Sequence, residues 1–446
     1  MTVRAIVLAA GKGTRMKSDV TKVLHELCGR PLLWYVIQAL RAAGIDDVLV
    51  VTNPELQNRI DEFGVRGVLQ GEQLGTGHAV QVALAAMTPS ERGRIVVAYG
   101  DMPLAGPAIY RSIVDALDGD VPMTLITARM PASSNFGRIV RRGENVERIV
   151  EARDATPEEL RIEEANAGIY AFHEDRLREA VSGLRNDNAQ KEYYLTDTVE
   201  KFVRGGERVR PILVEDAADV AGINDRVELA LARREMNARL CAAAMRDGVT
   251  IVDPDTTYLE PEVEIGRDTV IYPNTSLARL SCVGTHCVVG PNSRLSNARL
   301  GDRVTVRESV IVDSTLGDGV QVGPFAHLRA NARLAGGVRI GNFVEVKNSE
   351  LGDGAKANHL AYVGDASVGS GSNIGAGTIT CNFDGERKNR TTIGKNVSIG
   401  SNTSLVAPVD VGDGALTGAG SVVIRDVPAG ERVAGNPARP LPKKEV

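Results

Sequence analysis

A glycine-rich loop with basic side chains lies near the start of the sequence. Residues 8–16 read L-A-A-G-K-G-T-R-M, and Lys22 follows six residues later. Glycine lets backbone N–H groups approach a phosphate closely, and Lys12, Arg15 and Lys22 add cations that offset the charge of a polyphosphate. A tight strand-to-helix turn would use the same glycines. The loop alone therefore leaves a phosphate site and a plain turn both open.

The elements around this loop are typical of a parallel α/β sheet. Short apolar runs and stretches of helical spacing alternate, with strands expected at 5–9, 48–52 and 95–98 and helices at 31–43 and 78–86. Ligands of such sheets bind where the strands reach their carboxyl ends. Residues 11–15, Asn53 and 99–101 all follow strands, so we expect one site at this edge.

Two polar residues could hold a metal ion at that edge. Asp101 follows a buried strand, where a carboxylate could bind Mg²⁺ against substrate phosphates, although a turn aspartate before Pro103 is equally ordinary. Asn224 precedes an expected helix. Metal ligation and helix capping are both open for it, although Asp225 with Glu228 could cap the helix equally well.

The second half of the chain repeats an aliphatic residue every six positions. The repeat is carried by Ile265, Ile271, Leu277, Val283, Val289 and Leu295, by Leu316, Val322, Leu328, Leu334, Ile340 and Val346, and by Ile393, Ile399, Leu405 and Val411. This period predicts one short strand and one turn per six residues, with three such units in each coil and glycines at the turns. Residues 380–392 interrupt the pattern and predict a projecting loop.

Composition and length bound the remaining possibilities. The chain has 446 residues, 43% of them hydrophobic, and its 47 glycines cluster after about residue 265. We expect residues 1–224 and 248–446 to form two domains, joined by a linker helix over 225–247. The expected apolar stripe of that helix is Leu229, Ala232, Met236, Leu240 and Ala243.

Charge and cysteine usage exclude several classes of protein. A net charge of -5 argues against broad contact with nucleic acid. The five scattered cysteines favour a reducing compartment, and no apolar run is long enough to span a membrane, so we expect a cytoplasmic protein. Cys282, His286 and Cys287 lack further ligands nearby, so zinc is not expected.

Two motifs resemble known families. The 8–16 loop with Lys22 resembles the signature of sugar-nucleotide pyrophosphorylases, and L-Q-G-E-Q-L-G-T-G-H-A at 69–79 is similar to the base-reading stretch of one branch. The six-residue repeat resembles hexapeptide-repeat acyltransferases. Nearly the whole chain is similar to the bacterial bifunctional family of N-acetylglucosamine-1-phosphate uridyltransferase and glucosamine-1-phosphate N-acetyltransferase.

This resemblance implies an α/β Rossmann-like nucleotidyltransferase domain followed by a left-handed parallel β-helix. It implies a homotrimer with acetyltransferase sites between neighbouring chains, and small-molecule substrates without nucleic acid or membrane partners. The C-terminal half would acetylate glucosamine 1-phosphate with acetyl-CoA. The N-terminal half would transfer UMP from UTP to the product, giving UDP-N-acetylglucosamine for bacterial cell-wall polymers.

The resemblance also assigns residues of the uridyltransferase. Arg15 and Lys22 would be catalytic, and Mg²⁺ would bind Asp101 and Asn224. The nucleotide would contact Leu8, Ala9, Ala10, Gly11, Lys22, Gln70, Gly75, Thr76, Tyr99 and Gly100. The sugar phosphate would contact Gly137, Glu151, Asn166 and Asn224.

In the acetyltransferase, spacing alone does not favour His359 over His327 as a base, and the resemblance assigns this role to His359. Glucosamine 1-phosphate would contact Arg329, Lys347, Tyr362 and Asn373. Acetyl-CoA would contact Ala376, Asn382, Phe383, Ser401 and Ala419.

Several positions depart from the family pattern. Thr21 replaces the usual proline, Ala167 the usual threonine and Phe383 the usual tyrosine, and the C-terminal run 434–439 leaves the usual CoA-phosphate arginine unassigned. Two alternatives are a nucleotidyltransferase whose β-helix only oligomerises it, and a non-catalytic assembly subunit. Retention of the proposed catalytic residues of both halves argues against both alternatives.

Overall fold

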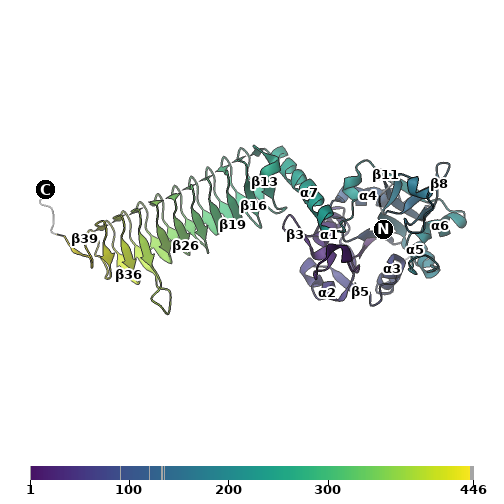
Figure 1. Cartoon of the computed structure of the whole chain (residues 1–446), viewed down its shortest axis with the longest axis horizontal. Coiled ribbons are helices and arrows are strands. Elements are labelled where there is room, and N and C mark those ends of the chain that lie inside the picture. The colour runs from purple at the N-terminus through teal and green to yellow at the C-terminus, as the bar shows by residue number, and fades with distance from the viewer. Residues whose placement is uncertain (1, 91, 120, 132–133, 135, 442–446) are drawn as a thin grey trace. The chain divides into compact units, whose positions relative to one another are not determined.

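The computed structural model describes residues 2–90, 92–119, 121–131, 134 and 136–441 (Figure 1). The chain divides into two compact units, Met1–Arg234 and Glu235–Val446. The division falls within α7 (Arg226–Arg246), one continuous helix of 21 residues.

The first unit is built on one mixed sheet. Its main strand order is β11-β7-β10-β6-β1-β4-β5. The strands are β1 (Val3–Leu8), β4 (Asp47–Thr52), β5 (Arg66–Leu69), β6 (Arg94–Tyr99), β7 (Met123–Arg129), β8 (Arg138–Arg142), β9 (Asn145–Val150), β10 (Glu164–His173) and β11 (Arg210–Val214). A separate hairpin joins β2 (Glu26–Leu27) to β3 (Arg30–Pro31).

Strand direction differs from the expected parallel sheet at β9 and β10. β1 runs parallel to β4 and β6, with Leu8 opposite Val51 and Tyr99, as expected. β10 runs antiparallel to β6 and β7 and also pairs with the β8–β9 hairpin. Because β10 is buried on both faces, as the parallel strands are, its apolar pattern carries no signal of direction.

Helices cover both faces of this sheet, as alternating side chains of β1 show. Ala5 and Val7 lie in one apolar core with residues of α1 and α4, whereas Ile6 and Leu8 lie in a second core with α3, α5 and α6. The helices are α1 (Leu32–Ala42), α2 (Pro54–Gln57), α3 (Thr76–Ala85), α4 (Pro107–Asp115), α5 (Glu174–Ser182) and α6 (Asp197–Arg204).

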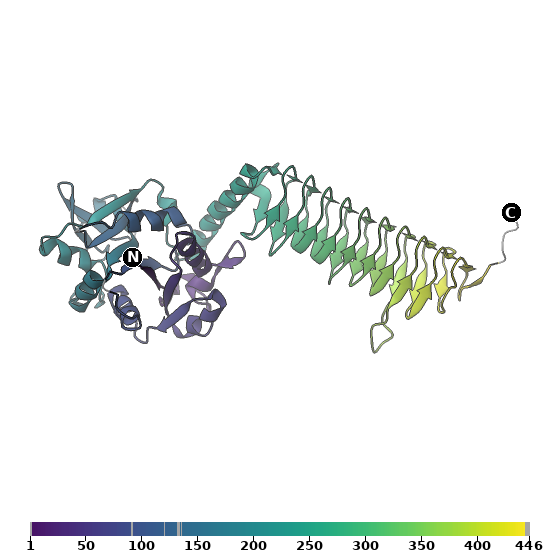
Figure 2. The ribbon, with the colours of Figure 1, turned by 180° about the vertical axis from the view of Figure 1, so that it is seen from behind.

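The second unit is a parallel β-helix, whose stacked coils are plain in Figure 2. One sheet holds β12 (Thr250–Ile251), β15 (Val270–Ile271), β18 (Val288–Val289), β20 (Thr305–Val306), β22 (Gln321–Val322), β25 (Arg339–Asn342), β28 (Lys356–His359), β31 (Asn373–Ile374), β34 (Ser398–Ile399), β37 (Leu416–Thr417), β39 (Arg432–Ala434) and the antiparallel β40 (Arg439–Pro440).

A second, larger sheet forms the other faces of the coils. It holds β13 (Thr257–Leu259), β14 (Glu264–Ile265), β16 (Thr275–Ala278), β17 (Cys282–Val283), β19 (Arg294–Leu300), β21 (Val310–Leu316), β23 (His327–Arg329), β24 (Arg333–Leu334), β26 (Glu345–Lys347), β27 (Glu350–Leu351), β29 (Tyr362–Gly364), β30 (Ala366–Val368), β32 (Ile379–Cys381), β33 (Thr391–Ile393), β35 (Ser404–Val406), β36 (Val409–Val411) and β38 (Val422–Val423).

The aliphatic repeat forms the core of the coils. Every repeat residue named above is buried except Ile265, which is half-buried and packs against the same core. Small polar side chains fill the corners without losing hydrogen bonds, as when the Thr269 hydroxyl donates to the Gly284 carbonyl at 2.8 Å. A Cβ on Gly266 would lie 2.7 Å from the backbone of Gly284, so close stacking of coils requires glycine there.

Two segments differ in detail from their expected form. In α7, Leu229, Ala232 and Met236 are buried as expected, but Ala243 is exposed and Cys241 is fully buried in its place. The projecting loop is shorter than expected, because β32 and β33 extend to Cys381 and from Thr391. Among the described residues, no helix is both long and apolar enough to cross a bilayer.

Candidate active sites

The loop after β1 uses its two glycines for different reasons. Gly13 has a φ of 60°, and a Cβ there would lie 2.6 Å from Cβ of Lys22. Gly11 has open space where a Cβ would point, on the lining of a cavity. One glycine therefore lets the loop turn against Lys22, and the other keeps backbone accessible to a ligand.

Two cavities meet at the carboxyl edge of the sheet. The larger has a volume of about 610 Å³ and the smaller about 210 Å³, and both are lined by Tyr99, Asp101 and Asn224. The larger cavity is also lined by Leu8, Ala9, Ala10, Gly11, Lys22, Gln70, Gly75 and Thr76, and the smaller by Arg15, Gly137, Glu151 and Asn166. Most of the positions expected at one edge thus gather in two adjoining cavities.

Asn53 and Gly100 are the exceptions, because neither lines either of these cavities, and Asn53 caps α2 instead. The Gly100 N–H donates to the Leu8 carbonyl at 2.9 Å, and a Cβ on Gly100 would lie 3.2 Å from Cβ of Ala9. Gly100 therefore joins the ends of β6 and β1, and supports the Ala9 backbone from behind.

Cationic side chains converge on Asp101 and Asn224. Lys22 Nζ donates to the Asp101 carboxylate and to Asn224 Oδ1, the latter at 3.2 Å. Arg15 donates to the same Asn224 oxygen at 2.8 Å. Two oxygen donors that already share one cation are suited to a magnesium ion, which uses one or two protein oxygens and takes further ligands from water and phosphate. The described residues contain no group of three or more His, Cys, Asp or Glu that could hold a metal alone.

The smaller cavity has a buried carboxylate at its wall. Glu151 Oε1 accepts a hydrogen bond of 2.9 Å from the Thr196 hydroxyl. Burial raises the pKa of Glu151 above its usual value, while the Thr196 hydrogen bond acts in the opposite direction. Asn166 donates from Nδ2 to Tyr170 at 2.7 Å. Glu151 and Asn166 are thus held as oriented polar groups, which suits recognition of sugar hydroxyls and amides.

Three polar contributors to this site were not among the individually assigned site residues. Gln73 and Glu192 line the larger cavity, and Gln73 donates to the Ala10 carbonyl at 2.5 Å. Thr196 orients Glu151, as described above. Gln73 falls inside the 69–79 motif and could have been found there. Glu192 and Thr196 lie more than 90 residues after Asp101 and belong to no motif that the sequence analysis identified.

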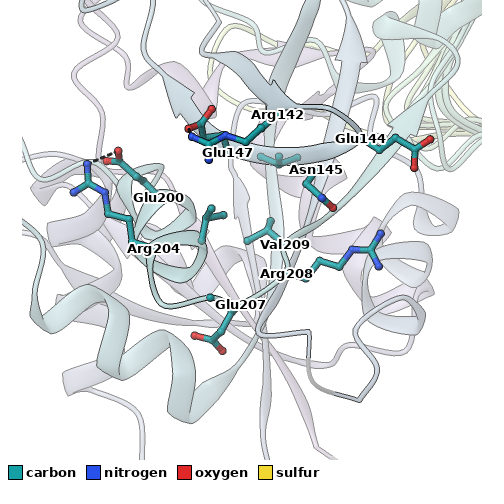
Figure 3. A pocket seen from close by; sticks show the side chains of 12 residues that line it. Arg142, Glu144, Asn145, Glu147, Glu200, Arg204, Glu207, Arg208 and Val209 are labelled. Carbon is teal, nitrogen blue, oxygen red and sulfur yellow. Dashed lines mark hydrogen bonds and ion pairs between the residues drawn. The ribbon is translucent and has the colours of Figure 1, made fainter.

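A further cavity of about 820 Å³ lies between the β8–β9 hairpin and α6 (Figure 3). Two pairs of its charges contact each other: Arg142 contacts Glu147 at 2.7 Å, and Arg204 contacts Glu200 at 2.7 Å. None of the residues expected to act in either half lines it. The cavity therefore lies apart from the expected sites of both halves.

In the second unit, His359 lies on β28 opposite Asn342 of β25. His359 Nδ1 is 2.8 Å from Asn342 Oδ1. Since an amide oxygen only accepts hydrogen bonds, this contact places the proton on Nδ1 and leaves the Nε2 lone pair available. The exposed imidazole is thus arranged as a base.

Arg329 and Lys347 are register partners on adjacent strands of the larger sheet. Arg329 pairs with Glu345 at 2.6 Å, and Lys347 Nζ lies 3.5 Å from Asp365. Burial acts to raise the pKa of Asp365, but hydrogen bonds from Asn348 and Asn382 with the Lys347 charge lower it overall. Asp365 therefore stays ionised and fixes the Lys347 ammonium.

Asn382 also links this group to Tyr362, since its Nδ2 lies 3.4 Å from the Tyr362 hydroxyl. Phe383, the next residue, is exposed and forms an isolated bridge with Lys388 at the base of the projecting loop. Asn373 lies on the other sheet, beside Lys356 of β28.

Ala376, Ser401 and Ala419 occupy one corner on successive coils. The Ala376 carbonyl accepts from Asn402 at 2.7 Å, and the Ser401 carbonyl from Gly420 at 2.8 Å. A wall of small residues results, to which only backbone and short side chains contribute.

The sites define a transferase with a nucleotidyl-transfer unit followed by a hexapeptide-repeat unit. Residues 5–189 match the model of the MobA-like NTP transferase domain, and residues 390–425 match the model of the bacterial transferase hexapeptide (six repeats). The chain is 45% identical over 429 residues to the bifunctional protein GlmU of Carboxydothermus hydrogenoformans, covering 95% of both proteins.

Two further GlmU proteins are similar over comparable lengths. That of Acetivibrio thermocellus is 44% identical, over 95% of this chain and 93% of the relative. That of Mycolicibacterium smegmatis is 43% identical, over 97% and 92%. The chain belongs to the family of bifunctional GlmU proteins. The expected fold and the expected pair of enzyme activities, uridyltransferase and acetyltransferase, are thereby confirmed.

Proposed function

We propose that the cavities of the first unit bind UTP and N-acetylglucosamine 1-phosphate, and that the exposed His359 of the second unit serves the acetylation of glucosamine 1-phosphate. Residues 1–224 would form the uridyltransferase domain, 225–247 the linker and 248–446 the acetyltransferase domain. The observation that carries the proposal is the convergence of Arg15, Lys22, Asp101 and Asn224 where two adjoining cavities meet.

In uridyl transfer, an oxygen of the sugar phosphate forms a bond to the α-phosphorus of UTP while the bond to pyrophosphate breaks. The attacking oxygen is already anionic, so no base is needed. Catalysis would rest on alignment of the two substrates and on neutralising the negative charge that accumulates on the phosphate oxygens in the transition state. Arg15 and Lys22 would supply the neutralising charge. Backbone around Gly11 would bind phosphate, and Glu151 and Asn166 would orient the sugar in the smaller cavity.

Mg²⁺ would be held by Asp101 and Asn224, and when bound it supplies charge neutralisation at the phosphates. Lys22 and Arg15 would then be released from these oxygens and turn toward the substrates. The same two cations would thus serve the substrate phosphates.

In acetyl transfer, the amine of glucosamine 1-phosphate attacks the thioester carbonyl of acetyl-CoA. A C–N bond forms and the C–S bond breaks, and His359 Nε2 takes the ammonium proton that the leaving thiolate then requires. Arg329 and Lys347 would bind the sugar phosphate, with Tyr362 and Asn373 on the sugar. Acetyl-CoA would run along Ala376, Ser401 and Ala419, beside Asn382 and Phe383.

We place this reaction in the cytoplasm and in a homotrimer. The candidate residues lie on two different sheets of the β-helix, since His359 and Asn373 belong to one and Arg329, Lys347 and Tyr362 to the other. A neighbouring chain would close the site between them. Light scattering should give three times the chain mass of 47.5 kDa, and a monomeric mass with full acetyltransferase activity would refute the trimer.

The test is a coupled assay with glucosamine 1-phosphate, acetyl-CoA, UTP and Mg²⁺, in which CoA thiol and pyrophosphate are followed separately. Wild type should release both. The His359→Ala variant should lose about 10²–10⁴-fold in CoA release and release pyrophosphate normally when given N-acetylglucosamine 1-phosphate. Pyrophosphate without any CoA from wild type would mean that the β-helix only oligomerises the protein.

A further inference from the structure

Thr21 is buried and belongs to a small polar cluster. It directly precedes Lys22, which lines the larger cavity. The Thr21 backbone N–H donates to Glu55 Oε2 at 2.9 Å, and its hydroxyl donates to the same oxygen. Asn53 Nδ2 donates to the Thr21 hydroxyl at 3.1 Å. The Thr21 side chain is therefore held from two directions.

The partners of Thr21 are themselves fixed to the sheet. Asn53 directly follows β4, and its Oδ1 caps α2 by accepting from the Leu56 N–H at 2.9 Å. Glu55 lies in the first turn of the same short helix. The cluster thus ties the segment carrying Lys22 to the carboxyl end of β4.

Lys22 needs such an anchor at its backbone, because its ammonium must change partners. Nζ contacts Asp101 and Asn224. If these two oxygens held a metal ion, both contacts at the tip of the Lys22 side chain would be lost. The backbone contacts of the segment are the packing of Gly13 against Lys22 Cβ, the hydrogen bond from the Leu24 N–H to the Thr21 carbonyl at 2.9 Å and that from the His25 N–H to the Lys22 carbonyl at 3.2 Å.

The Thr21 backbone has φ of -52° and ψ of 133°. A proline ring imposes nearly this φ, but a proline has no N–H to give to Glu55. This segment could therefore be fixed by the ring of a proline at position 21, or by hydrogen bonds from a residue that keeps its N–H. In this chain the hydrogen bonds of Thr21 to Glu55 fix it.

We propose that Thr21, Asn53 and Glu55 form a polar clamp that positions Lys22 for uridyl transfer. The inference rests on the proposed function of the first unit. These are positioning residues, since none donates to the oxygens of Asp101 or Asn224. Their effect should fall on kcat more than on KM for UTP, because a displaced Lys22 loses most where charge accumulates in the transition state.

The test is a double-mutant cycle in the full-length protein. Glu55→Ala should lower kcat for pyrophosphate release about 3–10-fold, less than the roughly 10²-fold that a 1 Å misplacement at a reacting centre can cost. In the Thr21→Pro background, Glu55→Ala should lower kcat no further, because a proline has neither an N–H nor a hydroxyl to donate to the Glu55 carboxylate. CoA release by the same preparations should not change, and thermal unfolding should show that each variant is folded.

Glu62→Ala is the matched control. Glu62 is an exposed glutamate that pairs with Arg59 at 2.8 Å on the turn after α2, and its removal should leave kcat unchanged. An equal loss from Glu55→Ala in both backgrounds, or no loss in either, would overturn the clamp.

If Thr21→Pro does not fold, Thr21→Val combined with Glu55→Ala tests the same coupling. Within one clamp the double variant should lose no more than the worse single variant, and additive losses would refute it. Wild type that releases no pyrophosphate at all would instead refute the proposed function.

Discussion

His359 Nδ1 lies 2.8 Å from the side-chain oxygen of Asn342, its register partner on the preceding coil. Parallel stacking places these two residues side by side although 17 positions separate them in the sequence. The orientation of the ring thus depends on the register of the coils, and not on the local segment alone.

Removing this contact should impair acetyl transfer without impairing uridyl transfer. Asn342→Ala leaves the ring free to rotate and to change tautomer, so we expect kcat for CoA release to fall about tenfold. Asn342→Asp places a carboxylate beside the ring and favours imidazolium, so the acidic limb of the CoA-release profile should move to higher pH. Pyrophosphate release is the internal control. An Asn342→Ala variant with wild-type CoA release at all pH values would contradict this role.

Asp101→Asn should change the magnesium requirement of the first unit. Loss of the carboxylate charge lowers the affinity of the Asp101 and Asn224 oxygens for Mg²⁺. We therefore expect the Mg²⁺ concentration for half-maximal pyrophosphate release to rise about 10–100-fold. Asp118→Asn is the control, because Asp118 is exposed and pairs with Arg210 away from the cavities. An unchanged Mg²⁺ titration for Asp101→Asn would place the metal elsewhere.

Asp197, the first residue of α6, should make the first unit less stable as pH rises. Burial, with the negative charges of Glu200 and Asp154, raises its pKa to about 6. An unfolded aspartate has a pKa of about 3.9, so the folded state holds the extra proton between these values. The stabilisation from that proton is fully present below about pH 4 and is lost as pH rises through 6.

The Asp197→Asn variant removes this cost. At pH 8 it should raise the free energy of unfolding by about 1 kcal/mol, allowing for partial solvent exposure and a weaker helix-dipole contact, and below pH 4 the gain should disappear. Trp34 on α1 is the single tryptophan of the chain, so its fluorescence reports unfolding of the first unit. A pH-independent difference between variant and wild type would refute the assignment.

The sequence predicted the repeating parts of this protein best. Residues such as Leu277 and Val289 are buried as their six-residue spacing requires, because each coil presents the same environment to the same position. The glycine loop and Asp101 were also placed correctly at one edge of the sheet, since strands of one direction end together.

Contacts between segments that lie far apart in the sequence could not be predicted from such spacing. The direction of β10, the contact of Thr196 with Glu151 and the pairing of Asn342 with His359 all join segments whose spacing has no period. Ala243 and Cys241 show the same limit within a helix, because small side chains do not mark which edge of an apolar stripe is covered.

The constant stacking of the second unit has a geometric consequence. Each coil advances the chain by one strand spacing, about 4.8 Å. Equivalent positions along the β-helix axis are therefore separated by whole multiples of this spacing. Inserting a complete coil before Asn342 would translate everything beyond it and leave His359 stacked on Asn342. Deleting a single hexad between Asn342 and His359 would instead rotate all that follows by one face of the coil, and the two residues would then lie on different faces.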